Sequence, residues 1–87
     1  MTDSEAWSNF YEYGGILSFC LRDLDENDAC YAEEAFRYGF IDGFNSIKED
    51  YYKNDTRIFY NEEEDLAFTL YSFYEEGAKA KKELEGK

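Results

Sequence analysis

The sequence contains no histidine, which excludes the usual pairings of a serine or cysteine nucleophile with a histidine base. It also lacks the HExxH zinc motif, the phosphate-binding P-loop and the GxGxxG dinucleotide motif. Carboxylates are abundant, but acid–base catalysis by a carboxylate pair needs a cleft that separates their two pKa values. A helical protein of 87 residues seldom encloses such a cleft, so we expect no enzymatic activity.

Proline is also absent, and this favours long helices joined by short turns. No run of 18 apolar residues is present, so no membrane-spanning helix is expected. The acidic start MTDSEAW lacks the apolar stretch of a secretory signal. Cys20 and Cys30 are predicted to be buried free thiols in a reducing cytoplasm rather than a disulfide.

Basic residues are scarce: nine Lys and Arg face 21 Asp and Glu, for a formal net charge of −12. The last nine residues hold four of the lysines and only two glutamates, so the rest of the chain is more acidic than the whole. Binding to nucleic acid needs clusters of Lys and Arg against the phosphates. The composition therefore disfavours direct contact with nucleic acid and favours a basic protein partner.

Aromatic residues are plentiful, with eight Phe, nine Tyr and one Trp. Each of these side chains buries about 150–250 Å² in a core, which offsets the small size of the chain. We expect one domain, residues 1–87, with an aromatic core and some tyrosines at the surface.

Residues 28–52 have the pattern of an amphipathic helix around which the other elements are expected to pack. Its predicted cap is Asn27 or Asp28. Residues Ala35, Gly39 and Gly43 place a small side chain at every fourth position, which predicts a close contact with another helix or a bulky ring. The predicted core face consists of Ala29, Ala32, Phe36, Gly39, Phe40, Gly43 and Ile47.

A first helix is predicted before this segment. Thr2 is its expected N-cap, with Glu5 completing a capping box. Gly14-Gly15 is expected to kink this helix or to split it in two.

A last helix is predicted from Asn61, with Glu64 at the capping-box position. Its apolar stripe runs on to Leu84, unless the helix ends at Gly77 and leaves a frayed basic tail at residues 79–87. Before it, residues 53–56 are expected to form a turn, and residues 57–60 either a helical turn or an extended link.

The predicted fold class follows from these segments. No stretch shows sustained strand alternation, so we expect an all-α protein, a small single-domain antiparallel bundle of three to four helices without significant sheet.

Asp23, Asp25, Asn27 and Glu34 match four ligand positions of a calcium-binding loop between two predicted helices. Asp28 replaces the glycine that makes the sharp turn of that loop, and no second loop pairs with it. Two interpretations stay open, a weak calcium-binding helix pair or a solvated acidic turn. The departures favour the turn, so neither a metal nor a cofactor is expected.

The carboxylates are numerous enough to imitate the phosphates of a nucleic acid. On a helix, carboxylates three or four residues apart lie about 5–6 Å apart, and duplex DNA carries one charge per about 1.7 Å of its axis. Carboxylates on neighbouring helical ridges would thus present a phosphate-like track to a basic groove. The alternative is an ordinary solvated acidic surface.

Apolar side chains within an acidic face would anchor such an interface. Tyr38, Ile41 and Tyr52 lie off the core stripe of residues 28–52, where they either meet a further element or form an exposed strip. The predicted partner-binding residues join this strip to nearby acidic positions: Glu33, Glu34, Tyr38, Ile41, Asp42, Glu49, Tyr52, Glu62, Glu63, Glu64 and Asp65.

In size, charge and composition the chain resembles the small acidic DNA-mimic inhibitors of phages and mobile elements, which block restriction, CRISPR or repair enzymes. The resemblance implies an inhibitor in the cytoplasm, of the host if phage-encoded, that binds a basic nucleic-acid-binding protein and no membrane. It carries no family motif and so transfers no functional residue. A monomer and a homodimer are both compatible with it.

A second hypothesis is a helical adaptor or antitoxin-type interaction module. In that case the Tyr38, Ile41 and Tyr52 strip carries the affinity, and the charge mainly confers solubility.

Overall fold

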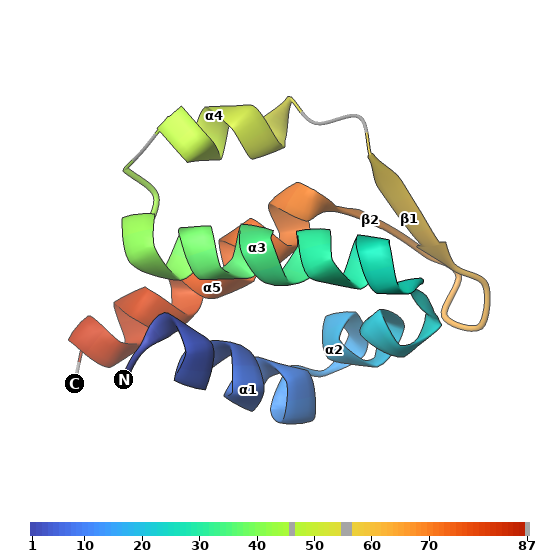
Figure 1. Ribbon diagram of the computed structural model, residues 1–87, viewed down its shortest axis with the longest axis horizontal. Coiled ribbons are helices and arrows are strands. Elements are labelled where there is room, and N and C mark those ends of the chain that lie inside the picture. The colour runs from blue at the N-terminus through green and yellow to red at the C-terminus, as the bar shows by residue number, and fades with distance from the viewer. Residues whose placement is uncertain (46, 55–56, 87) are drawn as a thin grey trace.

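Helix α3 (Glu26–Asp42) lies in the middle of the fold, and the other elements pack around it (Figure 1). The computed structural model describes residues 1–45, 47–54 and 57–86. Helix α5 packs behind α3, helices α1 and α2 cover one side, α4 covers the other, and a hairpin closes one end. In chain order the remaining elements are α1 (Asp3–Tyr13), α2 (Ile16–Cys20), the 3-10 turn η1 (Leu21–Asp23), α4 (Ile47–Lys53), β1 (Ile58–Asn61), β2 (Leu66–Thr69) and α5 (Leu70–Glu85).

The contact between α3 and α5 is built on two glycines. A Cβ placed on Gly39 would lie 2.0 Å from the carbonyl oxygen of Tyr74, and one placed on Gly77 would lie 2.0 Å from that of Phe36. Each helix therefore lays its backbone against the other where a side chain is missing. This confirms the close contact predicted at Gly39, and it shows that Gly77 lies inside α5 rather than at its end.

Helices α3 and α5 run in the same general direction, so the predicted antiparallel order is wrong for this pair (Figure 1). Contacts advance together along both helices: Phe36 meets Gly77, and further on Lys81 lies over the Phe40 ring and Lys82 over the Phe44 ring. Helix α4 and the hairpin return the chain to the starting end, which allows the parallel arrangement. Helix α5 continues to Glu85, so most of the predicted tail is helical.

Two predicted features of the first helix are confirmed, its N-cap at Thr2 and its interruption at Gly14-Gly15. The Glu5 N–H donates to the Thr2 hydroxyl at 3.2 Å, and Thr2 is the N-cap of α1. Helix α1 ends at Tyr13, and Gly15 has a φ of 76°, so the glycine pair splits the segment into α1 and α2.

The predicted helix at residues 28–52 is two helices. Asp25, rather than Asn27 or Asp28, caps α3 by accepting the Asp28 N–H at 2.8 Å. Gly43 ends α3 with a φ of 63°, a conformation that side-chain-bearing residues rarely adopt. The chain then folds back into α4, and Ile47, predicted to be in the core, is exposed.

Residues 58–61 and 66–69 form a small antiparallel hairpin, so the protein is mostly helical, as predicted, but is not a purely helical bundle. Phe59 lies opposite Phe68, and their ring centroids are 5.5 Å apart. Both rings face the core, whereas Ile58 and Tyr60 alternate to the outside. The predicted helix start at Asn61 is therefore also wrong, because α5 begins at Leu70.

The core is a chain of aromatic rings, as the composition predicts. Phe10 stacks on Phe36 at 4.8 Å, Phe73 meets Phe10 and Phe68 edge-on, and Trp7 packs against Phe36. Both cysteines are free, but only Cys20 is buried, and burial raises the pKa of its thiol. Cys30 is exposed on α3, contrary to expectation.

The fold is thus mostly helical, with five α-helices and one small sheet among the described residues. Of the turn predicted at residues 53–56, Asn54 follows α4 in a turn, and residues 55 and 56 lie outside the described residues.

Candidate functional site

The hairpin turn presents four consecutive carboxylates, Glu62–Asp65, all exposed. Asn61, only 2% exposed, shapes this turn: its side-chain oxygen accepts the Glu64 N–H at 3.0 Å. Its amide nitrogen donates to Asp23 Oδ2 at 2.9 Å. Asp23 lies just before α3. Because the buried Asn61 side chain bonds both Asp23 and the turn, Asn61 fixes the hairpin turn against the η1–α3 connection.

A second link joins the same two regions. Arg57, just before β1, forms an ion pair with Asp28 at 3.3 Å, and its guanidinium lies 4.0 Å from the centroid of the Tyr31 ring. The Arg57 side chain therefore bridges the base of the hairpin and the first turns of α3.

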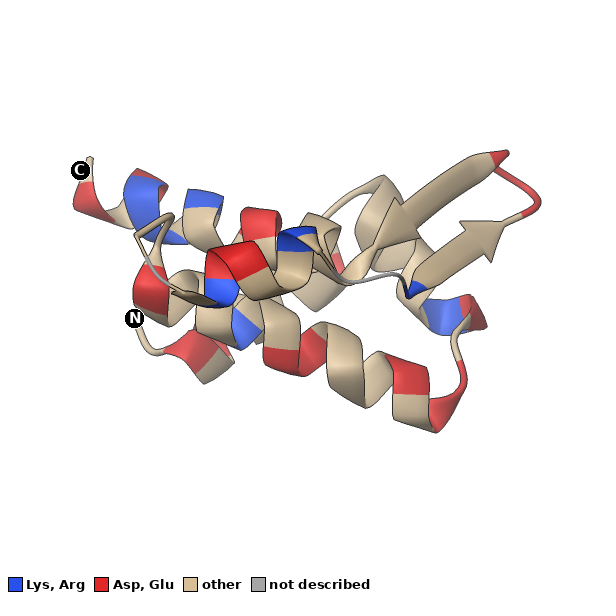
Figure 2. Ribbon diagram, turned by 90° about the horizontal axis from the view of Figure 1, so that it is seen from above, with Lys and Arg blue, Asp and Glu red and all other residues tan. Residues whose placement is uncertain are grey.

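These links gather two acidic segments at one end of the molecule, far from both termini (Figure 2). We call this set the acidic end; its members are Asp23, Asp25, Glu26, Asp28, Glu62, Glu63, Glu64 and Asp65. Residues 22–28 and 57–65 include only two cations, Arg22 and Arg57. The C-terminal part of α5, which includes Lys79, Lys81 and Lys82, lies at the opposite end of the molecule.

The cations that the structure describes are engaged by carboxylates or aromatic rings. Arg37 donates to Asp3 at 2.6 Å, and this hydrogen bond lowers the pKa of Asp3 and raises that of Arg37. The remaining partners are Phe19 for Arg22, Tyr38 for Lys48, Glu49 for Lys53, Asp28 for Arg57, Glu75 for Lys79, Glu85 for Lys81 and Phe44 for Lys82. Around the acidic end, eight carboxylates stand against only Arg22 and Arg57 in these two segments, so this end keeps a net negative charge.

The predicted partner-binding residues do not form one site. Glu62–Asp65 belong to the acidic end. Glu33, Glu34, Tyr38 and Ile41 line a hollow of about 430 Å³ on α3. The same Tyr38 and Ile41, with Asp42, line a neighbouring hollow of about 500 Å³ that reaches α4.

The two predicted residues on α4 have other surroundings. Tyr52 is buried, with its ring 5.3 Å from that of Tyr74, so it meets a further element and is not part of an exposed strip. Glu49 pairs with Lys53 at 2.7 Å along the same helix.

Half of the acidic end was missing from the predicted partner-binding set. Asp23 and Asp25 were interpreted as ligands of a weak calcium loop or as part of a solvated acidic turn, and Asp28 as a departure from that loop. The hairpin that brings Glu62–Asp65 beside them was not expected. The signal that could have indicated the hairpin is the run of β-branched and aromatic residues Ile58-Phe59-Tyr60 followed by a charged turn.

The geometry gives the calcium hypothesis no support. Asp25 caps α3, and Asp23 accepts the Asn61 amide. Glu34 lines the hollow near Arg37 instead. Within residues 1–45, 47–54 and 57–86, no three His, Cys, Asp or Glu side chains are grouped so that they could hold a metal ion.

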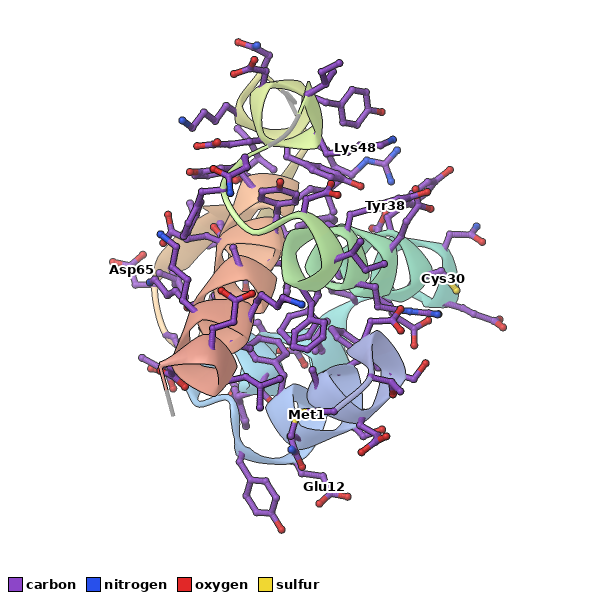
Figure 3. The ribbon with its side chains drawn as sticks, turned by 90° about the vertical axis from the view of Figure 1, so that its left-hand side faces the viewer. Met1, Glu12, Cys30, Tyr38, Lys48 and Asp65 are labelled. Carbon is purple, nitrogen blue, oxygen red and sulfur yellow. The ribbon has the colours of Figure 1, made fainter. Side chains whose placement is uncertain are left out.

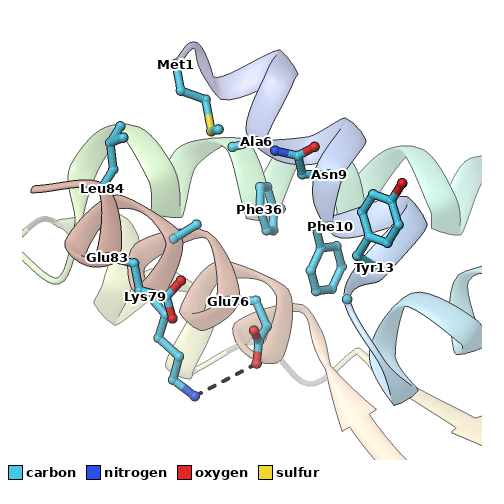
Figure 4. A pocket seen from close by; sticks show the side chains of 12 residues that line it. Met1, Ala6, Asn9, Phe10, Tyr13, Phe36, Glu76, Lys79, Glu83 and Leu84 are labelled. Carbon is cyan, nitrogen blue, oxygen red and sulfur yellow. Dashed lines mark ion pairs between the residues drawn. The ribbon is translucent and has the colours of Figure 1, made fainter. Parts of the chain in front are cut away.

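A further hollow, of about 340 Å³, opens between α1 and α5, with the Phe10 and Phe36 rings in its lining (Figure 4). The lining also includes Glu76 and Lys79, which pair at 3.8 Å. Its rim thus carries both signs of charge, and we assign no function to it.

Comparisons with known proteins identify no relative: no family model, no curated protein and no solved structure matches the chain. In the described part of the chain, no helix combines the length and apolar character needed to cross a membrane.

Proposed function

We propose that this protein is a non-enzymatic inhibitor that imitates DNA and occupies the basic groove of a nucleic-acid-binding protein. A defence or DNA-processing protein of the CRISPR-Cas, restriction or repair type is the target that fits best, and a phage or mobile element the fitting source. The observation that carries the proposal is the acidic end, where two segments more than 30 residues apart converge.

Convergence supports this function better than the charge of the chain alone. A solvated acidic surface needs no particular placement of its carboxylates, whereas a phosphate mimic needs them on one surface. Here Asn61 and Arg57 hold the two acidic segments together. Such a cluster would attract a basic groove at long range and exclude nucleic acid from it.

The experiment compares proteins captured from a host lysate by three immobilised forms of the chain. These are the wild type, Glu62→Lys with Glu63→Lys at the acidic end, and Glu83→Lys with Glu85→Lys on α5. The last variant is the matched control, because it makes the same change in net charge at the opposite end. All four glutamates are exposed.

We expect a basic protein that the wild type and the α5 control retain, and that short duplex DNA or added salt releases. For this protein, the Glu62→Lys with Glu63→Lys variant should associate about tenfold more slowly, since exposed charge mainly sets the encounter rate. A captured partner that binds DNA and this chain simultaneously, with salt-independent affinity, would contradict mimicry and favour the adaptor hypothesis.

A further inference from the structure

An apolar surface separate from the acidic end lies where α3 meets α4. We call it the α3–α4 face; it consists of Tyr38, Ile41, Ile47, Lys48 and Tyr51. Ile41 is 59% exposed, Ile47 87% and Tyr51 61%, so three large side chains of one surface are exposed together.

The supports of this face are buried. Tyr52 is packed against Tyr74, and the Tyr74 hydroxyl donates to the Gly43 carbonyl at 3.0 Å. These contacts tie α4 to the core and to the end of α3. The face is therefore displayed on two helices that are anchored from behind.

Lys48 joins the two helices across the face. Its Nζ lies 4.6 Å from the centroid of the Tyr38 ring on α3 and 5.5 Å from that of the Tyr51 ring on α4. Figure 3 shows Lys48 and Tyr38 on the same side of the molecule. The lysine stem adds to the apolar surface while its ammonium group stays near the rings.

The hollows on α3 and at its junction with α4 share Tyr38 and Ile41. The first carries the acidic side chains Asp3, Glu33 and Glu34 beside Arg37, and the second carries Asp42 beside Lys48. An incoming side chain would meet apolar surface at Tyr38 and Ile41 and carboxylates around it. This combination suits a ligand that is apolar on one side and basic around it.

We propose that the α3–α4 face binds a basic amphipathic helix of the partner protein. One or two apolar side chains of that helix fill the hollows beside Tyr38 and Ile41, and its lysines or arginines meet Glu33 and Glu34. The inference rests on the proposed function only in taking the partner to be basic.

A second copy of this chain fits the face less well than a basic helix. Two copies, each with a net charge of −12, repel one another. A stable interface also buries about 800 Å² per partner over 20–30 residues, and the residues that line the two hollows, together with Tyr51, number twelve. A single helix laid into a groove needs only a few anchors along one side.

The test uses a synthetic helical peptide of about 18 residues, long enough to form a helix on binding. Leucines line one side of the peptide and lysines the other. The control peptide keeps every lysine and replaces the leucines by serine. Binding is measured by calorimetry, and the site is mapped from amide NMR shifts of the full chain.

We expect the leucine peptide to shift the amides of residues 38–51 and to bind about tenfold more weakly to Ile41→Ala with Ile47→Ala. Ile16→Ala with Ile58→Ala is the matched control, because both of these isoleucines are exposed on other surfaces. That control should leave the affinity unchanged, and the serine peptide should bind at least about tenfold more weakly than the leucine peptide.

Equal binding of the two peptides, or shifts centred on residues 62–65, would overturn the proposal. Sedimentation that shows a dimer dissociated by Ile41→Ala with Ile47→Ala would overturn it in favour of a second copy. None of these results bears on competition with DNA at the acidic end, so the proposed function can stand or fail separately.

Discussion

At the scale of single residues, three glycines have different structural roles. Gly39 and Gly77 are needed because another helix backbone occupies the place of their side chains. Gly43 has open space around its missing Cβ and is needed for its positive φ. The sequence pattern grouped Gly39 and Gly43 together on one face, and only backbone geometry separates crowding from conformation.

Replacement of Gly39 or Gly77 by alanine should destabilise the protein by about 1–3 kcal/mol, because the added methyl overlaps a carbonyl that cannot move independently of its helix. The destabilisation caused by this overlap should exceed the about 1 kcal/mol that alanine gains over glycine in helix propensity. The change in the free energy of unfolding is measured by urea denaturation. Gly86→Ala, where the nearest atom is 3.3 Å away, is the control and should be nearly neutral. A raised midpoint for Gly39→Ala would show that the two helices do not touch there.

Gly43→Ala and Gly43→Leu should cost nearly the same, about 1–3 kcal/mol each, because the penalty comes from the backbone conformation and not from side-chain volume. Urea midpoints of the two variants provide the comparison. If Gly43→Leu destabilised the protein much more than Gly43→Ala, the close helix contact predicted at Gly43 from the sequence would be supported instead.

At the scale of elements, local signals predicted the first helix well and the hairpin badly. The Thr2 cap and the Gly14-Gly15 break act within a few residues of themselves, so the sequence reveals them. The Asn61…Glu64 spacing was interpreted as a helix cap, yet the same N–H to side-chain contact forms in a tight turn. The pairing of Phe59 with Phe68 decides between the helix cap and the tight turn. Strands of only four residues give little sequence pattern from which this pairing could be predicted.

The same limit applies to the candidate site. The charged turn at Glu62–Asp65 and the apolar side chains of Tyr38 and Ile41 could be predicted from composition and spacing. Their grouping could not, because it depends on the Asn61 and Arg57 bridges and on the reversal of the chain at Gly43. Tyr52 changed from a predicted surface anchor to a core residue for the same reason.

Asn61→Ala should destabilise the fold by about 1–3 kcal/mol, since it removes the two part-buried hydrogen bonds that the Asn61 side chain makes with Asp23 and with the Glu64 N–H, each worth about 0.5–1.5 kcal/mol. Hydrogen exchange should quicken at the amides of residues 62–66, whereas the first turn of α5 should keep its protection. Asn27→Ala, at an exposed position once expected to cap α3, serves as the control and should stay within about 0.5 kcal/mol. Unchanged exchange at residues 62–66 would show that Asn61 does not hold the hairpin turn.

At the scale of the whole molecule, the charge opposes the compact state. The chain has 21 Asp and Glu residues but only nine Lys and Arg. Eight of the 21 carboxylates lie at the acidic end. Self-repulsion of this kind weakens when salt screens the charges, over a length of about 10 Å at 0.1 M ionic strength.

The urea midpoint should therefore rise between 10 mM and 500 mM sodium chloride. Glu62→Lys with Glu63→Lys should raise it at low salt and reduce its response to salt, because two repelling charges at the acidic end are reversed. Urea is the suitable denaturant since it adds no ions. A midpoint that does not change with salt would show that the carboxylates are already well accommodated in the folded state.

The separation of charge along the molecule also affects how it approaches a partner. Eight carboxylates gather at one end of a body 36 Å long, whereas at the other end three lysines offset the charge of carboxylates beside them. Such a body carries a permanent electric dipole, and the field of a basic groove exerts a torque on it before any contact is made. The hairpin tip should then point at the groove on arrival, which reduces the fraction of encounters lost to wrong orientation.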